Sequence, residues 1–133
     1  MTSNDDNFYR EELMEIYKNP ANKGSLANPT VHVHETNPMC GDVIDLDLDI
    51  KDNQVVNAKF NGDTCAVSAV SAELLLEEIK GKSLAEINQI DKEKLLNLIG
   101  ITLTTSRIKC ATLSLEALQK ALKTYEETTK NRN

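Results

Sequence analysis

The most regular pattern in the sequence is an alternation of aliphatic and acidic residues over positions 44–50. Four aliphatic side chains would share one face of a strand there, and three aspartates would share the opposite face. Weaker alternations occupy 30–35 and 56–60. Asp52-Asn53, between segments 44–50 and 56–60, is a typical tight turn. The three segments predict an antiparallel meander with one buried face and one acidic, solvated face.

Helical spacing, in which apolar residues recur every three or four positions, covers most of the remaining sequence. It predicts helices over 8–17, 66–80, a short segment after Ser83, a segment from Asp91 to Gly100, and about 111–127. Ser83 and Glu86 match a capping box, and Gly100 is a typical helix stop. Residues 21–29 and the threonine-rich segment 101–109 are predicted to be irregular.

A sheet with one apolar face must bury that face against other elements. We therefore predict an α+β fold in which helices cover a three-stranded antiparallel sheet. A chain of 133 residues has the length of a single domain, and no internal repeat is evident, so we predict one domain over 1–133. Polar tails are expected at about 1–6 and 128–133.

Composition and charge argue against nucleic-acid binding and against association with a membrane. Fifteen basic against twenty-one acidic residues give a net charge of −6, so nucleic acid is not an expected partner. No apolar run approaches the roughly 20 residues of a membrane-spanning helix, and the polar N-terminus is unlike a secretory signal. We therefore expect a cytoplasmic protein that does not associate with membranes.

The sequence contains three cysteines, Cys40, Cys65 and Cys110, and an odd number cannot form a closed disulfide framework. In a reducing cytosol such thiols are buried structural residues, reactive groups or metal ligands. Cys65 follows a turn and opens a predicted helix, where the positive end of the helix dipole favours a thiolate. Cys110 is predicted to open the last helix in the same way, with Arg107 and Lys109 adding positive charge beside it.

Cys40 and Asp42 are separated by one glycine, which leaves the backbone free to turn both side chains toward one point. Together with Cys65 and Cys110 they offer three thiolates and one carboxylate, a ligand set suited to zinc or ferrous iron. With a divalent ion the site would carry a net charge of about −2, which the nearby cations would partly offset. Separations of 25 and 45 residues between successive cysteines match no local zinc-finger spacing, so the fold would have to assemble the site. Three unrelated buried cysteines are the alternative.

Three motifs around these residues carry a family resemblance: Asn37-Pro38-Met39-Cys40-Gly41-Asp42, Gly62-Asp63-Thr64-Cys65-Ala66-Val67-Ser68 and Arg107-Ile108-Lys109-Cys110-Ala111-Thr112-Leu113. The chain resembles the IscU/SufU/NifU N-terminal family of iron–sulfur cluster assembly proteins over nearly its whole length. The resemblance implies a SufE/NifU-like fold in which the three cysteines and Asp42 hold zinc or a transient [2Fe–2S] cluster. It also implies a PLP-dependent cysteine desulfurase as the partner that delivers persulfide sulfur, and apo iron–sulfur proteins or cluster carriers as recipients.

Within that resemblance, Cys40 and Cys110 are the candidate persulfide acceptors, the first for its flexible loop and the second for its basic neighbours. Arg107 and Lys109 are expected to support the site electrostatically or to help dock a partner. We expect the protein to be a monomer or a weak homo-oligomer.

Two departures from the family patterns leave two functions open. The IscU branch usually has His before the third cysteine and Leu-Pro-Pro-Val-Lys just upstream, where this sequence has Lys109 and Leu103-Thr104-Thr105-Ser106-Arg107. The SufU branch usually carries an insertion between the second and third cysteines, and a separation of 45 residues leaves little room for one.

The first of these functions is a non-enzymatic scaffold that builds a cluster and passes it on. The alternative is a zinc-bound, sulfurtransferase-type acceptor that stimulates the desulfurase. A purely structural zinc module is a third possibility. A zinc hydrolase or deaminase is disfavoured, because the sequence has no His-x-Glu and no Cys-x-x-Cys motif.

Overall fold

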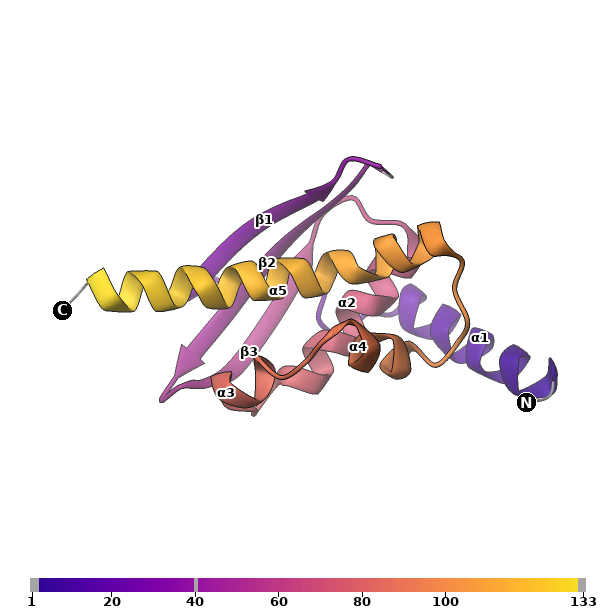
Figure 1. The fold of residues 1–133 in the computed structure, drawn as a ribbon, viewed down its shortest axis with the longest axis horizontal. Coiled ribbons are helices and arrows are strands. Elements are labelled where there is room, and N and C mark those ends of the chain that lie inside the picture. Colours follow the sequence, from indigo (N-terminus) through magenta and orange to yellow (C-terminus); the bar gives the residue numbers. More distant parts are fainter. Residues whose placement is uncertain (1–2, 40, 132–133) are drawn as a thin grey trace.

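A computed structural model of the chain describes the backbone of residues 3–39 and 41–131 and the side chains of residues 11–39 and 41–130. The elements along this part of the chain are α1 (Ser3–Lys18), β1 (Val31–Asn37), β2 (Asp42–Lys51), β3 (Gln54–Asn61), α2 (Ala66–Ile79), α3 (Leu84–Ile87), α4 (Lys92–Ile99) and α5 (Thr105–Asn131) (Figure 1). This succession of one helix, three strands and further helices confirms the predicted α+β class.

The three strands form one antiparallel sheet in the order β1-β2-β3, as the alternating patterns predict. Leu46 of β2 lies opposite Val33 of β1 and Phe60 of β3, so apolar side chains of all three strands share one face. Asp52 and Asn53 adopt positive φ angles of 53° and 60° in the hairpin between β2 and β3. Such angles match the twist of the flanking strands in a two-residue turn.

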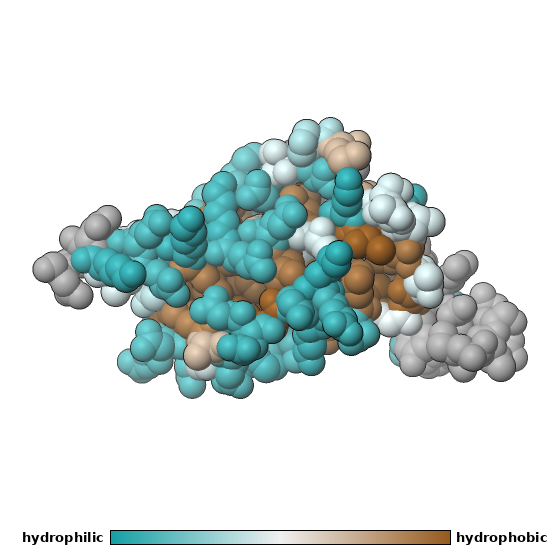
Figure 2. Space-filling view, viewed as in Figure 1, coloured by the Kyte–Doolittle hydropathy of each residue, from teal (hydrophilic) through white to brown (hydrophobic). Residues whose placement is uncertain are grey.

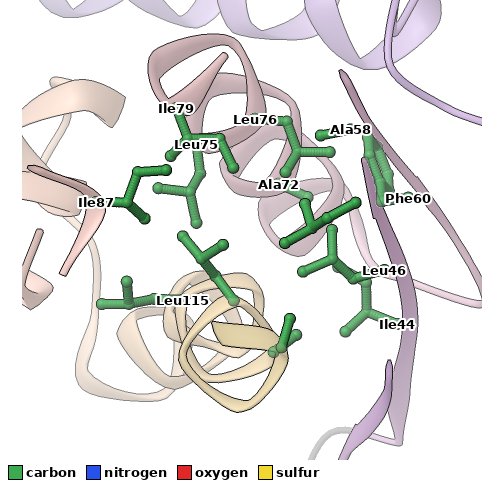
Figure 3. Packing of buried hydrophobic residues seen from close by; sticks show 14 of the residues in the cluster. Ile44, Leu46, Ala58, Phe60, Ala72, Leu75, Leu76, Ile79, Ile87 and Leu115 are labelled. Atoms are coloured by element: carbon green, nitrogen blue, oxygen red, sulfur yellow. The ribbon is translucent and has the colours of Figure 1, made fainter. Parts of the chain in front are cut away.

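Helices α2 and α5 cover the apolar face of the sheet (Figure 1). Helix α5 packs on β1 and β2, whereas α2 packs on β3 and on α5. In Figure 3, side chains of the sheet and of α2 point into one shared core: Ile44, Leu46 and Phe60 from the sheet, and Leu75 and Leu76 from α2. Because full burial of one such side chain contributes about 2 kcal/mol, this shared core holds the two helices and the sheet in fixed relative positions.

The backbone is helical in parts of both segments that were predicted to be polar tails. Helix α1 begins at Ser3, within the first of these segments. Helix α5 continues to Asn131, with Lys130 in its last turn near the negative end of the helix dipole.

Helix α5 also begins earlier than predicted, at Thr105 rather than at about residue 111. The carbonyl oxygen of Thr104 accepts the Ile108 N–H at 2.9 Å and so closes the first turn. Cys110 therefore lies in the second turn of the helix and not at its N-terminus. The prediction that Cys110 opens this helix is wrong, and the helix-dipole argument made for its thiol does not apply, because that effect fades beyond the first turn.

The loop that precedes β1 adds to the outer edge of β3. Lys23 forms a parallel bridge with Phe60, and the Gly24 N–H donates to the Phe60 carbonyl at 2.8 Å. Asn22 is fully buried, and Glu73 of α2 accepts hydrogen bonds from its backbone N–H at 2.8 Å and from its side-chain amide at 3.1 Å. Covering the strand edge in this way occupies backbone groups that would otherwise be open to pairing with another chain.

The outer face of the sheet is less solvated than its alternation predicts. Asp47 is 7% exposed, accepts the Leu26 N–H at 3.0 Å and lies 2.5 Å from His32 Nδ1. Asp45 pairs with His34 Nδ1 at 2.8 Å. Cross-strand histidines and the loop before β1 therefore partly shield these aspartates from water.

On the face shown in Figure 2, hydrophilic side chains cover most of α5, and an apolar area lies toward the α1 end of the molecule. A groove of about 220 Å³ is lined by apolar side chains of α1, of α2 and of the connection before α5, including Leu13, Val67 and Leu103. Among the described residues, no helix combines the length and the apolar character that crossing a bilayer requires.

Candidate metal centre

Three of the predicted ligand residues meet at one end of the sheet. Asp42 is the first residue of β2, Cys65 is the N-cap of α2, and Cys110 lies in α5. Asp42 and Cys110 are each 6% exposed, and Cys65 is half-buried. One ligand atom from each residue, a carboxylate oxygen and two Sγ atoms, lies within 4.8 Å of the other two. The fold thus brings donor atoms from three separate elements to one point.

A close approach of two backbone segments places Asp42 beside Cys65. Gly62, in the turn after β3, has a φ of +118°, and a Cβ atom there would lie 2.3 Å from the Val43 carbonyl oxygen. The Val43 N–H donates to the Asp63 carbonyl at 2.8 Å. The Cys65 N–H in turn donates to Asp42 Oδ1 at 3.1 Å. Glycine at position 62 therefore sets the distance between the start of β2 and the start of α2.

The described residues on either side of position 40 make contacts with one another and with α5. The Gly41 N–H donates to the Asn37 carbonyl at 2.8 Å. Asn37 Nδ2 donates to the Lys109 carbonyl of α5 at 3.4 Å, and Lys109 Nζ lies 3.4 Å from Met39 Sδ. Cys40 itself lies outside the described residues, so its place among the ligands stays a prediction.

These elements border an open cleft of about 730 Å³. Asp42, Cys65 and Cys110 line it together with Arg107 and Lys109. Both basic side chains are exposed. An ion or a small group can therefore reach the donor atoms from solvent, past positive charge.

The donor set fits a zinc ion. Tetrahedral zinc, with bonds of about 2.3 Å to sulfur and about 2.0 Å to oxygen, keeps its ligand atoms roughly 3.5–3.8 Å apart. Separations of up to 4.8 Å are within a small side-chain adjustment of that arrangement. Two thiolates and one carboxylate leave one tetrahedral position, which Cys40 is predicted to fill.

Residues 8–132 match the family model of the NifU-like N terminal domain. The chain belongs to this family. The match includes all three strands and every residue of the metal centre.

Relatives of this NifU-like chain carry two kinds of name. The zinc-dependent sulfurtransferase SufU of Bacillus subtilis is 38% identical over an alignment that covers 90% of this chain and 92% of that protein. The iron–sulfur cluster assembly scaffold protein IscU of Haemophilus influenzae is 31% identical over 122 residues, which cover 89% of this chain and 95% of that protein. Relatives under both names therefore align with nearly the full chain.

Solved structures agree with the NifU-like architecture. One from Fervidobacterium islandicum, ascribed to iron–sulfur cluster assembly in the SUF system, has a TM-score of 0.72 at 25% identity and covers 84% of this chain and 94% of its own. The N-terminal part of a NifU-like protein from Brucella abortus has a TM-score of 0.72 at 17% identity and covers 92% of this chain and 96% of its own. These similarities confirm the predicted fold class.

In this NifU-like chain, Arg107 and Lys109 lie on the same cleft as the predicted ligands, which is where a supporting role requires them to be. Their role stays a prediction, as do the ligand roles of the gathered residues. Cys110 is a candidate persulfide acceptor that is almost fully buried. Sulfur would therefore have to enter the cleft to reach it.

Two residues of the centre were missed in the sequence, Ser68 and Asn37. Ser68 is fully buried, and its Oγ lies 2.5 Å from Asp42 Oδ2 and 2.9 Å from the Cys110 carbonyl oxygen. The sequence spacing could have indicated Ser68, because Ser68 follows Cys65 by about one helical turn and so lies on the same side of α2. The contact of Asn37 with α5 had no local signal, because it joins positions 72 residues apart.

Proposed function

We propose that this chain is a scaffold for iron–sulfur cluster assembly. It accepts persulfide sulfur from a PLP-dependent cysteine desulfurase, binds zinc or iron through its three cysteines and Asp42, and passes a [2Fe–2S] cluster to apo-proteins or carriers. The observation that carries the proposal is the gathering of Asp42, Cys65 and Cys110 within 4.8 Å at an open cleft. Membership of the NifU-like family and the scaffold names of its relatives support it.

A second function is favoured by the relatives' names. The Bacillus subtilis relative, at 38% identity, is named a zinc-dependent sulfurtransferase, whereas the Haemophilus influenzae scaffold is 31% identical. In this second function the chain keeps zinc at the site, accepts sulfur from the desulfurase and raises its turnover without building a cluster. The same four residues serve both functions.

Sulfur transfer requires only thiol chemistry from this chain. A cysteine thiolate of the site attacks the terminal sulfur of the desulfurase persulfide, and the desulfurase cysteine leaves as a thiolate. One S–S bond forms as another breaks, so no external oxidant or reductant takes part. Zinc, when bound, keeps its cysteine ligands deprotonated. Cys40 and Cys110 are the proposed acceptors.

The desulfurase is proposed to dock at the mouth of the cleft. Arg107 and Lys109 are exposed there on a chain whose net charge is −6. A local positive patch on an acidic protein can orient a partner whose docking surface is acidic. Cytoplasmic location, a single domain over 1–133 and a monomeric or weakly associating state stay predictions.

Anaerobic reconstitution separates the two functions. The purified chain is incubated with desulfurase, cysteine, ferrous iron and a thiol reductant, while visible absorption and desulfurase turnover are followed. A scaffold develops a chromophore that can be transferred to an apo-ferredoxin. An acceptor keeps its zinc and stimulates turnover without a chromophore.

The matched variants are Cys110→Ser, at the site, and Ser106→Ala, which also lines the cleft but is not among the donors. Cys110→Ser should lose both chromophore and stimulation, and Ser106→Ala should keep them. If the parent chain shows neither property, or if Cys110→Ser performs as well as the parent, the proposed function is wrong.

A further inference from the structure

The hydroxyl of Ser68 contacts all three residues gathered at the metal centre. Ser68 lies in the first turn of α2 and is fully buried. Its Oγ lies 2.5 Å from Asp42 Oδ2 and 2.9 Å from the Cys110 carbonyl oxygen. On its other side, the Cys65 thiol donates to the same oxygen at 3.5 Å.

The single proton of this hydroxyl has two acceptors within reach. The Cys110 carbonyl lies inside α5, where the helix supplies a backbone N–H to it. The Asp42 carboxylate is closer and is negatively charged when ionised, and charge-assisted hydrogen bonds are about twice as strong as neutral ones. Ser68 therefore donates to Asp42.

The two oxygens of Asp42 are held by different donors. Oδ1 accepts the Cys65 N–H at 3.1 Å, and Oδ2 accepts the Ser68 hydroxyl at 2.5 Å. Two donors on opposite oxygens fix the plane of a carboxylate, while each oxygen keeps a second lone pair for another partner. Without Ser68, Oδ2 loses this donor, and the Cys65 N–H on Oδ1 alone does not fix the plane of the carboxylate in the same way.

We propose that Ser68 is a positioning residue of the metal centre and acts by orienting the Asp42 carboxylate toward the two thiols. This inference rests on the proposed function, because it takes Asp42 as a ligand. Groups that hydrogen-bond to a metal ligand from outside the site fix its orientation, and replacing one typically costs about 10–100-fold in metal affinity.

Ser71 offers a matched control in the same helix. It is also fully buried, but its hydroxyl donates to the Val67 carbonyl one turn back, at 2.7 Å. Replacing either serine by alanine removes one buried hydroxyl from α2. Only Ser68→Ala removes a donor to Asp42.

Zinc affinity, measured by competition with a chromophoric chelator, tests the proposal. Ser68→Ala should bind zinc about 10-fold more weakly than the parent chain, whereas Ser71→Ala should stay within about twofold. Ser68→Thr, which keeps the hydroxyl, should restore most of the affinity. Equal losses in Ser68→Ala and Ser71→Ala would overturn the proposal.

A double-mutant cycle asks whether Ser68 acts through Asp42. In an Asp42→Ala background, Ser68→Ala should cause no further loss of zinc affinity, because no carboxylate remains to be oriented. If Ser68→Ala lowers zinc affinity by the same factor in both backgrounds, Ser68 does not act through Asp42, and the proposal is overturned. If Ser68→Ala does not fold, Ser68→Thr and Ser68→Val replace it, since they differ only in a hydroxyl against a methyl group.

The role of Ser68 and the existence of the metal centre can be tested separately. Parental zinc affinity in Ser68→Ala, together with impaired binding in Cys65→Ser, would overturn the role of Ser68 alone. Absence of zinc binding by the parent chain, or unchanged binding in Cys65→Ser, would overturn the metal centre and the role of Ser68 with it.

Discussion

A methyl group at position 62 would meet the Val43 carbonyl oxygen at 2.3 Å, so the turn after β3 keeps its path only with glycine. We predict that Gly62→Ala lowers the free energy of unfolding by about 3 kcal/mol or more, measured by urea denaturation. The substitution should also weaken zinc binding, because the same turn holds Asp63 against β2.

Gly24→Ala is the control for backbone conformation. Gly24 also has a positive φ, +142°, but a Cβ atom there would meet nothing within 4 Å. Its loss should therefore be limited to backbone strain, about 1–2 kcal/mol. Equal losses in the two variants would show that contact with β2 does not explain the glycine at position 62.

Single substitutions at the predicted ligands test whether these residues bind zinc. Cys65→Ser should weaken zinc binding by about 60- to 700-fold, since each of four ligands carries roughly a quarter of the 10–16 kcal/mol of a structural zinc site. Ser106→Ala, which changes another side chain of the same cleft, should leave zinc affinity nearly unchanged. Isothermal titration with zinc, or chelator competition, measures both. Similar affinities in the two variants would contradict the ligand assignment.

Helix α3 begins with a complete capping box, formed by Ser83 and Glu86. We expect this capping box to contribute to the stability of the fold in a way that depends on pH. Glu86 accepts hydrogen bonds from the Ser83 N–H at 3.1 Å and from the Ser83 hydroxyl at 3.0 Å. These bonds, with a smaller effect of nearby Lys82, hold the pKa of Glu86 below its ordinary value of 4.5. Because the pKa is lower in the folded chain, the carboxylate stabilises the fold above that ordinary value, and this contribution disappears as the pH falls through the lowered pKa.

We therefore predict that Glu86→Gln makes thermal stability fall less steeply with acidity, between about pH 5 and pH 3, than in the parent chain. Melting temperatures followed by circular dichroism across that range measure the effect. Glu116→Gln, an exposed position in the middle of α5, is the control and should keep the parental slope. Parallel curves for parent and Glu86→Gln would contradict a role for the capping box in acid stability.

Asn22 joins the loop before β1 to α2, and we expect this contact to stabilise the fold. Asn22 bonds to Glu73 through its backbone and its amide, and Lys80 Nζ donates to its side-chain oxygen. Asn22→Ala leaves the buried Glu73 short of a hydrogen bond and should cost about 1–3 kcal/mol of unfolding free energy. The exposed Asn88→Ala should cost less than about 0.5 kcal/mol.

Amide hydrogen exchange locates the effect of Asn22→Ala. The Gly24 N–H, which donates to β3, should exchange faster in this variant, because the loop is no longer held against the strand edge. Protection in the centre of β2 should change only by the global loss of stability. Unchanged exchange at Gly24 would show that the loop is held by other contacts.

Across the entire fold, the metal centre joins β2, α2 and α5, which also contribute to the shared hydrophobic core. Zinc that binds the folded chain but not the unfolded chain stabilises it by about 2.7 kcal/mol at a free concentration of 100 times the dissociation constant. We predict a zinc-dependent rise in melting temperature that disappears in Cys110→Ser. A rise of the same size in that variant would place the ion elsewhere.

The architecture of the sheet and most helix boundaries could be predicted because their signals are local. Alternation with a period of two marks β2, and the hairpin at Asp52-Asn53 follows from residues that tolerate positive φ. The capping box at Ser83 and the left-handed cap at Gly100 likewise lie where the sequence predicts them. Each depends on neighbours within a few positions of the chain.

The start of α5 could not be predicted in the same way. Threonine and serine before Arg107 have low helix propensity and are typical of irregular segments. In the folded chain they continue the helix that carries the buried Leu113 and Leu118, and packing of that helix on the sheet outweighs the local preference. The prediction that Cys110 opens the last helix was wrong for this reason, whereas Arg107 and Lys109 line the same cleft as Cys110.

The amino-acid order alone specifies the fold class, the kinds of donor atoms available and the family motifs, because periodicity and residue type are properties of short segments. The meeting of Asp42, Cys65 and Cys110 within 4.8 Å, the place of Ser68 among them and the burial of Asn22 against Glu73 arise only when distant segments pack. Their distances are set by contacts such as that of Gly62 with β2, which join residues about twenty positions apart and which no local pattern encodes.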